Sequence, residues 1–216
     1  MARRHDSLRR RRPFREVKRR FLLVCEGEVT ERHYFNDLRR EAGSLVELKI
    51  EHGGTPKTLV ERAVQIKKAA EGDAKRSKDE NLKYDAAWCV FDVDEHPFLA
   101  EARQQAHDNG ISVAVSNPCF ELWALFHFQD QRAHIERREV QRLCRQYMPR
   151  YEKRLPCEDL LPSYREAVHR SIALEQWNHT RGTEGGNPST GVHKLTEEIM
   201  NEARSSAAAR QRPPGH

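Results

Sequence analysis

The sequence predicts an α/β protein, with a mostly parallel sheet flanked by helices and a C-terminal helical extension. Over residues 20–115, short apolar runs alternate with helix signals in the order β-α-β-α-β-α-β. This order implies parallel strands joined by right-handed crossovers, because each helix returns the chain to the same end of the sheet. From residue 118 onward the strand signals stop while the helix signals continue. The last third of the chain is therefore expected to be helical.

Each element of the first two-thirds has its own local signal. Thr30 is an N-cap residue and Gly43 a stop residue, so a helix is expected between them. Thr55 and Pro56 suit the N-cap and the first position of a second helix. In order, strands are expected at 20–25, 45–51, 84–91 and 111–115, with helices at 30–42, 55–70 and 97–109 between them.

Prolines and charged stretches divide the rest of the chain. The segment 71–83 is charged and contains glycine, which predicts a loop. Pro149, Pro156 and Pro162 separate the helices of the C-terminal part, which are expected at 118–128, 136–148, 161–180 and 189–205. The expected organisation is a disordered Arg-rich arm at 1–18, an α/β core at 19–128, a helical extension at 129–205 that packs back on the core, and a disordered tail at 206–216.

The positive charge is concentrated at the N-terminus. The chain carries a net charge of +5, and residues 1–20 hold nine Arg and one Lys against Asp6 and Glu16, a local charge of +8, so that residues 21–216 carry −3. The arm, with Arg10, Arg11 and Arg12 at its centre, is expected either to hold a nucleic-acid backbone or to act as a solubilising tail. The folded body is not a uniformly basic nucleic-acid binder.

Several classes of protein are not expected. No apolar run approaches the roughly 20 residues of a membrane helix, and the basic N-terminus has no apolar segment behind it, so a soluble cytoplasmic protein is expected. The five cysteines are odd in number and form no C-x-x-C pair, which argues against a disulfide framework or a zinc ribbon.

Carboxylates end two of the predicted strands. Glu26 follows the first strand, and Asp92 and Asp94 follow the third. Neighbouring parallel strands would bring these side chains together at the carboxyl edge of the sheet, where α/β proteins bind ligands. Clustered carboxylates repel one another, and a divalent ion such as Mg²⁺ offsets the repulsion. Glu26 is expected to be a metal ligand or a general base. The alternative for Asp92 and Asp94 is that they cap the next helix.

A second group of polar residues follows the fourth strand. Ser116 and Asn117 are expected at the same edge, before a helix whose N-terminus could contact a phosphate. Glu121, in the first turn of that helix, would either complete the metal site or complement the helix dipole.

The glycine-rich turn 185–191 precedes the last helix. If it folds back over the acidic edge, polar side chains of the turn and of the start of that helix are expected to contact phosphate or relay protons; these are Asn187, Ser189, Thr190, His193 and Lys194. The alternative is an interhelical loop with a solvated histidine.

A different chemistry, a cysteine hydrolase, would use Cys119 at a helix N-terminus with His127.

The strand-end motifs resemble those of a known family. The string V-C-E-G-E-V-T-E-x-x-Y-F resembles the first Toprim motif, with Glu26 at the position of the Toprim glutamate, and F-D-V-D-E-H resembles the Toprim D-x-D motif. The strings S-N-P-C-F-E-L-W and N-P-S-T-G-V-H are similar to those of RloB-like proteins. The resemblance spans about residues 18–205 and implies a Toprim-type core, with Asp92 and Asp94 as ligands of Mg²⁺, for which Mn²⁺ can substitute.

The resemblance also implies a function. RloB-like proteins are linked to phage defence and to restriction loci, and they resemble the small partner of an abortive-infection pair in which an ATPase encoded alongside would act as the sensor. We therefore expect a Mg²⁺-dependent nuclease that cleaves DNA or RNA, with Glu26 and His193 in catalysis. The alternatives are a non-cleaving nucleic-acid or partner-binding sensor module with a degenerate Toprim site, and phosphoryl or nucleotidyl transfer. DNA, RNA and tRNA remain alternative substrates, and homo-oligomerisation stays open.

Overall fold

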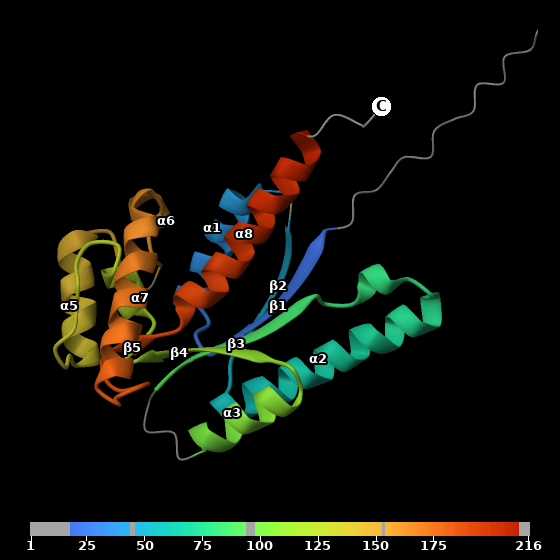
Figure 1. Ribbon diagram of the computed structural model, residues 1–216, viewed down its shortest axis with the longest axis horizontal. Helices are drawn as coiled ribbons and strands as arrows, with labels where there is room; N and C mark the ends of the chain where they lie inside the picture. Colours follow the sequence, from blue (N-terminus) through green and yellow to red (C-terminus); the bar gives the residue numbers. More distant parts are fainter. Residues whose placement is uncertain (1–17, 44–45, 94–97, 153, 212–216) are drawn as a thin grey trace, which may run out of the picture.

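The computed structural model describes residues 18–43, 46–93, 98–152 and 154–211. Four of the residues expected at the site lie outside the described residues: Arg10, Arg11, Arg12 and Asp94. The fold is α/β, as predicted, and is built on a mostly parallel five-stranded sheet of order β2-β1-β3-β4-β5 (Figure 1). The strands are β1 (Arg19–Cys25), β2 (Val46–His52), β3 (Ala86–Asp92), β4 (Ser112–Asn117) and β5 (Ser189–Thr190).

The strands alternate their side chains between two apolar layers. In β1, Phe21, Leu23 and Cys25 belong to one buried cluster, whereas Leu22 and Val24 belong to the other. This division follows from the two-residue period of a strand, which sends successive side chains to opposite faces. A strand buried on both faces reads as an unbroken apolar run. The run 20–25 was predicted as a strand on that ground.

Helices cover both faces of the sheet. The helices α2 (Pro56–Ser77) and α3 (Leu99–Asp108) pack on one face, and α1 (Thr30–Ala42) and α8 (Val192–Gln211) on the other. Between β4 and β5 the chain forms α4 (Glu121–Leu125), α5 (Arg137–Tyr147), α6 (Cys157–Leu160) and α7 (Tyr164–Thr180). We call these four helices the helical extension, which starts before the predicted residue 129 and excludes α8, because α8 packs on the sheet. The extension lies beyond the carboxyl ends of β3 and β4 (Figure 1).

The helical extension shares the larger core cluster with the sheet. Trp123 of α4 and Leu174 of α7 belong to the same cluster as Leu23 of β1 and Tyr34 of α1. Trp123 is fully buried and meets Tyr34 edge-on, with ring centroids 6.4 Å apart. The extension therefore packs back on the sheet as part of one core.

Two segments are more helical than the sequence predicted. The helix α2 continues to Ser77, so the predicted loop at 71–83 is wrong over residues 71–77. Charged residues are good helix formers, and Ala74 is fully buried, which gives this exposed stretch an anchor. The helix α8 continues to Gln211, so residues 206–211 of the predicted disordered tail are helical. The alanines of this segment have the highest helix propensity.

The strand β5 was not predicted, because two residues give no periodic signal. It pairs antiparallel with the end of β4, with Thr190 opposite Ser116. Gly191 follows it and lies so close to β4 that a Cβ there would be 3.4 Å from the Val115 nitrogen.

Among the described helices, none has both the length and the apolar character that crossing a bilayer requires.

Candidate active site

The carboxyl ends of β1 and β3 bring two carboxylates together. The strands are parallel neighbours, with Cys25 opposite Val90, and the Glu26 amide continues their ladder to the Val90 carbonyl at 2.9 Å. The Glu26 side chain crosses to the neighbouring strand, where its Oε2 accepts a hydrogen bond from the Asp92 amide at 3.1 Å. Glu26 and Asp92 therefore meet at the sheet edge, as their places at two strand ends imply.

Two further carboxylates lie beside this pair. Glu31, in the first turn of α1, is 5% exposed, and its Oε1 accepts a hydrogen bond from the Gly27 amide at 3.1 Å. Gly27 leaves room for this carboxylate, since a Cβ at position 27 would lie 1.8 Å from Glu31 Oε2. Glu121, at the start of α4, is 7% exposed. We call these four residues, Glu26, Glu31, Asp92 and Glu121, the acidic edge.

Residues of the helical extension hold Glu121 in place. Its Oε1 accepts hydrogen bonds from the Tyr151 hydroxyl at 2.6 Å and from Gln141 Nε2 at 3.3 Å. The Tyr151 hydroxyl is buried beside this carboxylate, and burial is the main reason that the pKa of Tyr151 is raised. Glu121 thus has its own hydrogen-bond partners, whether or not it also binds a ligand.

Burial and mutual repulsion act on the acidic edge. Burial, and then the neighbouring charge of Glu31, raise the pKa of Asp92 well above its usual value, and the charge of Arg137 acts in the opposite direction. Arg137 Nη2 donates to Asp92 Oδ2 at 3.1 Å and to the Pro118 carbonyl at 3.3 Å. Burial also raises the pKa of Glu31, with a smaller contribution from the charge of Glu121. The site therefore carries more negative charge than Arg137 offsets, which favours binding a cation.

The donors fit Mg²⁺ in kind, although they do not form a ready-made site. Among the described residues, no group of three or more His, Cys, Asp or Glu side chains is arranged to hold a metal ion. One oxygen of Asp92 already contacts Arg137, and one oxygen of Glu121 contacts Tyr151. Mg²⁺ prefers oxygen ligands and takes only one or two carboxylates from a protein. Glu26 and Asp92 are the adjacent pair that would supply them.

Ser116 and Asn117 are the last two residues of β4, which runs two residues beyond its predicted end, and the polar residues at this strand end and in the turn that meets it are largely engaged within the fold. The Ser116 and Thr190 hydroxyls hydrogen-bond to each other at 2.9 Å in a buried position. Asn117 Nδ2 donates to the Gly185 carbonyl at 3.1 Å. The Asn187 side chain makes two hydrogen bonds to the Ile135 backbone, at 3.0 and 2.9 Å. The turn does return to the end of β4, but these four side chains hold it there.

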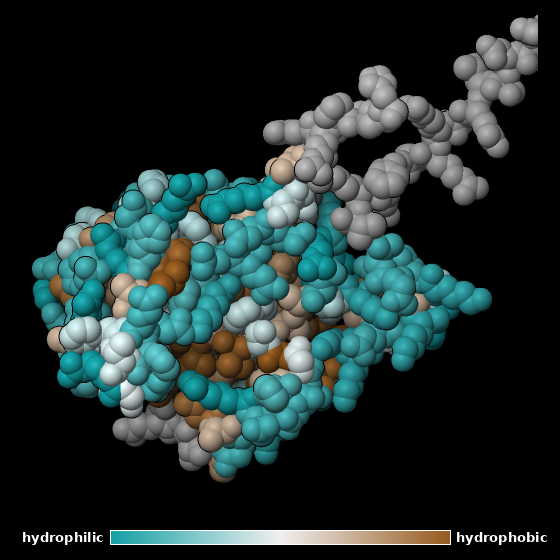
Figure 2. Space-filling view, in the orientation of Figure 1, coloured by the Kyte–Doolittle hydropathy of each residue, from teal (hydrophilic) through white to brown (hydrophobic). Residues whose placement is uncertain are grey.

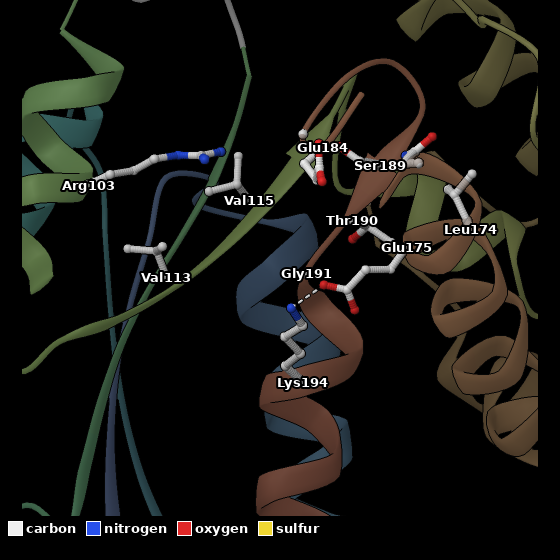
Figure 3. A pocket seen from close by; sticks show the side chains of 12 residues that line it. Arg103, Val113, Val115, Leu174, Glu175, Glu184, Ser189, Thr190, Gly191 and Lys194 are labelled. Carbon is white, nitrogen blue, oxygen red and sulfur yellow. Dashed lines mark hydrogen bonds and ion pairs between the residues drawn. The ribbon is translucent and has the colours of Figure 1, made fainter. Parts of the chain in front are cut away.

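His193 and Lys194 face α7. His193 is 2% exposed, and its Nε2 lies 3.4 Å from Glu175 Oε2. Burial lowers the pKa of His193, and the charge of Glu175 opposes this effect. Lys194 forms an ion pair with the same Glu175, marked by the dashed line in Figure 3. No contact recorded for these described residues places His193 against a carboxylate of the acidic edge.

A small pocket of about 190 Å³ opens beside β4, and Ser189 and Lys194 line it together with Arg103 of α3 (Figure 3). Val113 and Val115 form its apolar wall, and Figure 2 shows apolar surface at this place, between α8 and α3. None of the four carboxylates of the acidic edge lines this pocket. It is therefore separate from the candidate active site.

The cysteine-hydrolase alternative has no support in the structure. Cys119 is fully buried, and burial together with the charges of Glu121 and Asp92 raises the pKa of its thiol. A nucleophilic cysteine needs a lowered pKa. His127 packs edge-on against Trp123 with ring centroids 4.9 Å apart, and burial lowers its pKa to about 4. Both residues belong to the core.

Two residues of the site were not singled out from the sequence. Glu31 lies in the same Glu-rich string as Glu26, and its position in the first turn of a predicted helix could have identified it as a site residue. Arg137 gave no signal, because it lies 45 residues from Asp92 and reaches it only through the packing of α5.

We expect Glu31→Gln to stabilise the protein at neutral pH in the absence of divalent ions. The pKa of Glu31 is higher in the folded state, so the protonated carboxyl favours folding and the ionised form opposes it. The stabilisation from the protonated form is fully present below the unfolded pKa of about 4.3 and is lost as pH rises through the folded pKa. Glutamine keeps the acceptor for the Gly27 amide. Thermal unfolding in EDTA should show a higher Tm for the variant at pH 7 and a vanishing difference near pH 4.

The matched control is Glu28→Gln, which removes an exposed carboxylate from the same segment. It should leave Tm unchanged within about 1 °C, as surface substitutions do. A Glu31→Gln protein that is less stable than the wild type at pH 7 would contradict the charge argument.

The fold and the acidic edge together define a class, an α/β protein whose mostly parallel sheet carries clustered carboxylates at its carboxyl edge. A family model described as RloB-like protein matches residues 21–199. The chain belongs to the RloB-like family. No curated protein and no solved structure matches it.

Proposed function

We propose that this protein is a Mg²⁺-dependent nuclease that cleaves phosphodiester bonds of DNA or RNA at the acidic edge. The observation that carries the proposal is the contact of Glu26 with the Asp92 backbone, which joins two strand-end carboxylates in a buried site where the pKa of Asp92 is raised. The proposal also draws on the resemblance of both strand-end motifs to Toprim motifs.

The residues of the acidic edge have distinct proposed roles. Glu26 and Asp92 would hold the ion, which would polarise the scissile phosphate and stabilise charge on the leaving oxygen. Arg137 already contacts Asp92 from a half-exposed position, and its guanidinium is suited to bind a phosphate oxygen of the substrate. Glu31 is a buried carboxyl group beside them, and Glu121 of α4 is joined to the rest of the helical extension through Tyr151.

The test is cleavage by the purified full-length protein. Labelled single-stranded and duplex DNA and RNA, and tRNA, are incubated with the protein in Mg²⁺, in Mn²⁺ or in EDTA. We expect cleavage of at least one substrate in Mg²⁺ and none in EDTA. Equal cleavage in EDTA would overturn the metal requirement, and no cleavage of any substrate in either ion would count against a nuclease that acts alone.

A second candidate is a non-cleaving nucleic-acid or partner-binding module. It is favoured by one observation, namely that Arg137 and Tyr151 occupy carboxylate oxygens and that no ready-made metal group exists among the described residues. Calorimetric titration with Mg²⁺ separates the two candidates. Saturable binding that is lost in Asp92→Asn supports the nuclease, whereas no Mg²⁺ binding together with measurable nucleic-acid affinity supports the binding module.

We also propose a setting for this activity, on the resemblance alone. The protein would act as the effector of a phage-defence or abortive-infection system, with an ATPase encoded alongside it as sensor. Co-purification with that ATPase, and faster cleavage in its presence than by the protein alone, would support this arrangement.

A further inference from the structure

An exposed tryptophan stands between two arginines at the end of α7. Trp177 is 39% exposed, although large aromatic residues are usually buried. The Arg181 guanidinium lies 4.9 Å from the centre of its ring, and that of Arg132 lies 5.3 Å away. We call these three residues, Arg132, Trp177 and Arg181, the Trp177 patch.

The patch carries positive charge that no acid cancels. Neither Arg132 nor Arg181 lies within ion-pair distance of a carboxylate in the described part of the chain. The acids closest to these arginines in the sequence have other partners, since Glu184 pairs with His179 at 2.8 Å and Asp130 with Arg170 at 3.7 Å. The two guanidinium groups are therefore available to an anionic ligand.

Two asparagines hold the patch together. Arg132 lies in the loop before α5, and the Asn187 side chain binds that loop through both backbone groups of Ile135. Asn178 of α7, next to Trp177, donates to the Pro188 carbonyl at 2.9 Å. Because Asn187 and Pro188 are adjacent, the same turn joins both parts of the patch. This arrangement gives Asn187 a positioning role in place of the expected phosphate contact.

The same loop connects the patch to the acidic edge. It runs from Arg132 to Arg137, whose guanidinium contacts Asp92 at 3.1 Å. Five residues span no more than about 18 Å between their Cα atoms. A strand of a few nucleotides that lies across Arg137 can therefore reach Trp177.

We infer that the Trp177 patch binds single-stranded nucleic acid, with a base stacked on the indole and the flanking phosphates held by Arg132 and Arg181. An exposed cation–π contact is weaker than base–aromatic stacking, so a base can displace a guanidinium from the ring, and that guanidinium can then bind a phosphate bidentately. A duplex offers no unstacked base within it, so the patch should prefer a single strand. The inference rests on the proposed function for its choice of ligand, since it extends the path of the nucleic acid beyond the acidic edge.

The test measures binding in EDTA, so that it does not depend on cleavage. The full-length protein is titrated into labelled oligo-dT and oligo-U of about 12 nucleotides, and into duplexes of the same length, at about 150 mM salt to weaken non-specific contacts. Trp177→Ala should weaken single-strand binding about 5- to 100-fold, and Trp177→Phe should recover most of the affinity. Arg132→Ala and Arg181→Ala should each reduce the salt slope by about 0.7.

Matched controls come from another helix of the extension and from α2. Tyr147 is another exposed aromatic residue of the extension, 44% exposed, and Arg76 is an exposed arginine at the end of α2. Tyr147→Ala and Arg76→Ala should bind as the wild type does. Trp88 and Trp123 are buried, so quenching of tryptophan emission by the oligonucleotide should come from Trp177 and disappear in Trp177→Phe.

The outcomes separate this inference from the nuclease proposal. Wild-type affinity in a folded Trp177→Ala protein, or an equal loss in Tyr147→Ala, would overturn the patch as a binding site even if Mg²⁺-dependent cleavage is found. No single-strand affinity in the wild-type protein would overturn it as well. Binding that depends on Trp177, found without any cleavage in Mg²⁺, would support the patch and would count against a nuclease that acts alone. Comparing the affinity for oligo-dT with that for oligo-U then shows whether the patch prefers DNA or RNA.

Discussion

Asp92→Asn is expected to reduce Mg²⁺-dependent cleavage by about 10²–10³-fold or more, the effect of losing several kcal/mol of metal-assisted transition-state stabilisation. Asparagine has nearly the same shape as aspartate and keeps an oxygen for Arg137, but it removes the negative charge that would hold the ion. The fold should survive, because the Asp92 carboxylate is largely shielded from solvent and its pKa is raised, so its charge opposes folding at neutral pH. Cleavage rates, Tm in EDTA and Mg²⁺ titration are measured on the same preparation.

The control for this substitution is Asp85→Asn, at the opposite end of β3. Asp85 precedes that strand at its opposite end, where it accepts hydrogen bonds from Arg19 at 3.1 Å and from the Arg20 amide at 2.8 Å. Asp85→Asn should leave cleavage unchanged. If Asp92→Asn cleaves at the wild-type rate, Asp92 is not part of the catalytic site; if Mg²⁺ binding disappears while cleavage persists, the ion that is measured is not the catalytic one.

Trp123→Ala is expected to lower the free energy of unfolding by about 3–5 kcal/mol, since it removes a large side chain from a packed core. Trp123 is fully buried and meets Tyr34 of α1 and Tyr164 of α7 edge-on, at 6.4 and 6.2 Å between centroids. For a chain of this size, 1 kcal/mol shifts Tm by about 2–4 °C, so Tm should fall by about 6–20 °C. Denaturant unfolding measures the change in the free energy of unfolding, and thermal unfolding independently measures the change in Tm.

The same experiment tests whether the sheet and the helical extension form one folding unit. Their side chains share one buried cluster, so wild type and variant should both unfold in a single transition. Trp177→Ala, which removes a partly exposed tryptophan, should shift Tm far less than Trp123→Ala does. Two transitions, of which Trp123→Ala moves only one, would show that the extension is a separate unit.

The local pattern of the chain was enough to predict the parallel core. The apolar run 20–25, the helix signals at Thr30 and Thr55, and the turn at Gly110 depend on near neighbours in the sequence. Each of the four expected strands exists, with both ends within two residues of the predicted bounds. The placement of Glu26 and Asp92 at one edge follows from the same pattern, because strands joined by helices run parallel and end together.

The partners of these acids depend on contacts between distant segments. Arg137 reaches Asp92, Tyr151 reaches Glu121, and Asn187 reaches Ile135 across separations of 45, 30 and 52 residues. No local signal encodes such contacts, since they arise from how the extension packs on the core. The charge state of the acidic edge likewise follows from burial, which is a property of the folded chain.

The sequence alone therefore predicts where the carboxylates lie in the fold, whereas the tertiary structure determines the partners and the burial of each one. Periodicity and turn residues act over a few positions, and these specify the strands and the edge at which Glu26 and Asp92 meet. Burial, ion pairing and the joining of Arg132 to Trp177 come from segments that are far apart in sequence. Their free energies depend on distances and solvent exclusion that exist only in the folded protein.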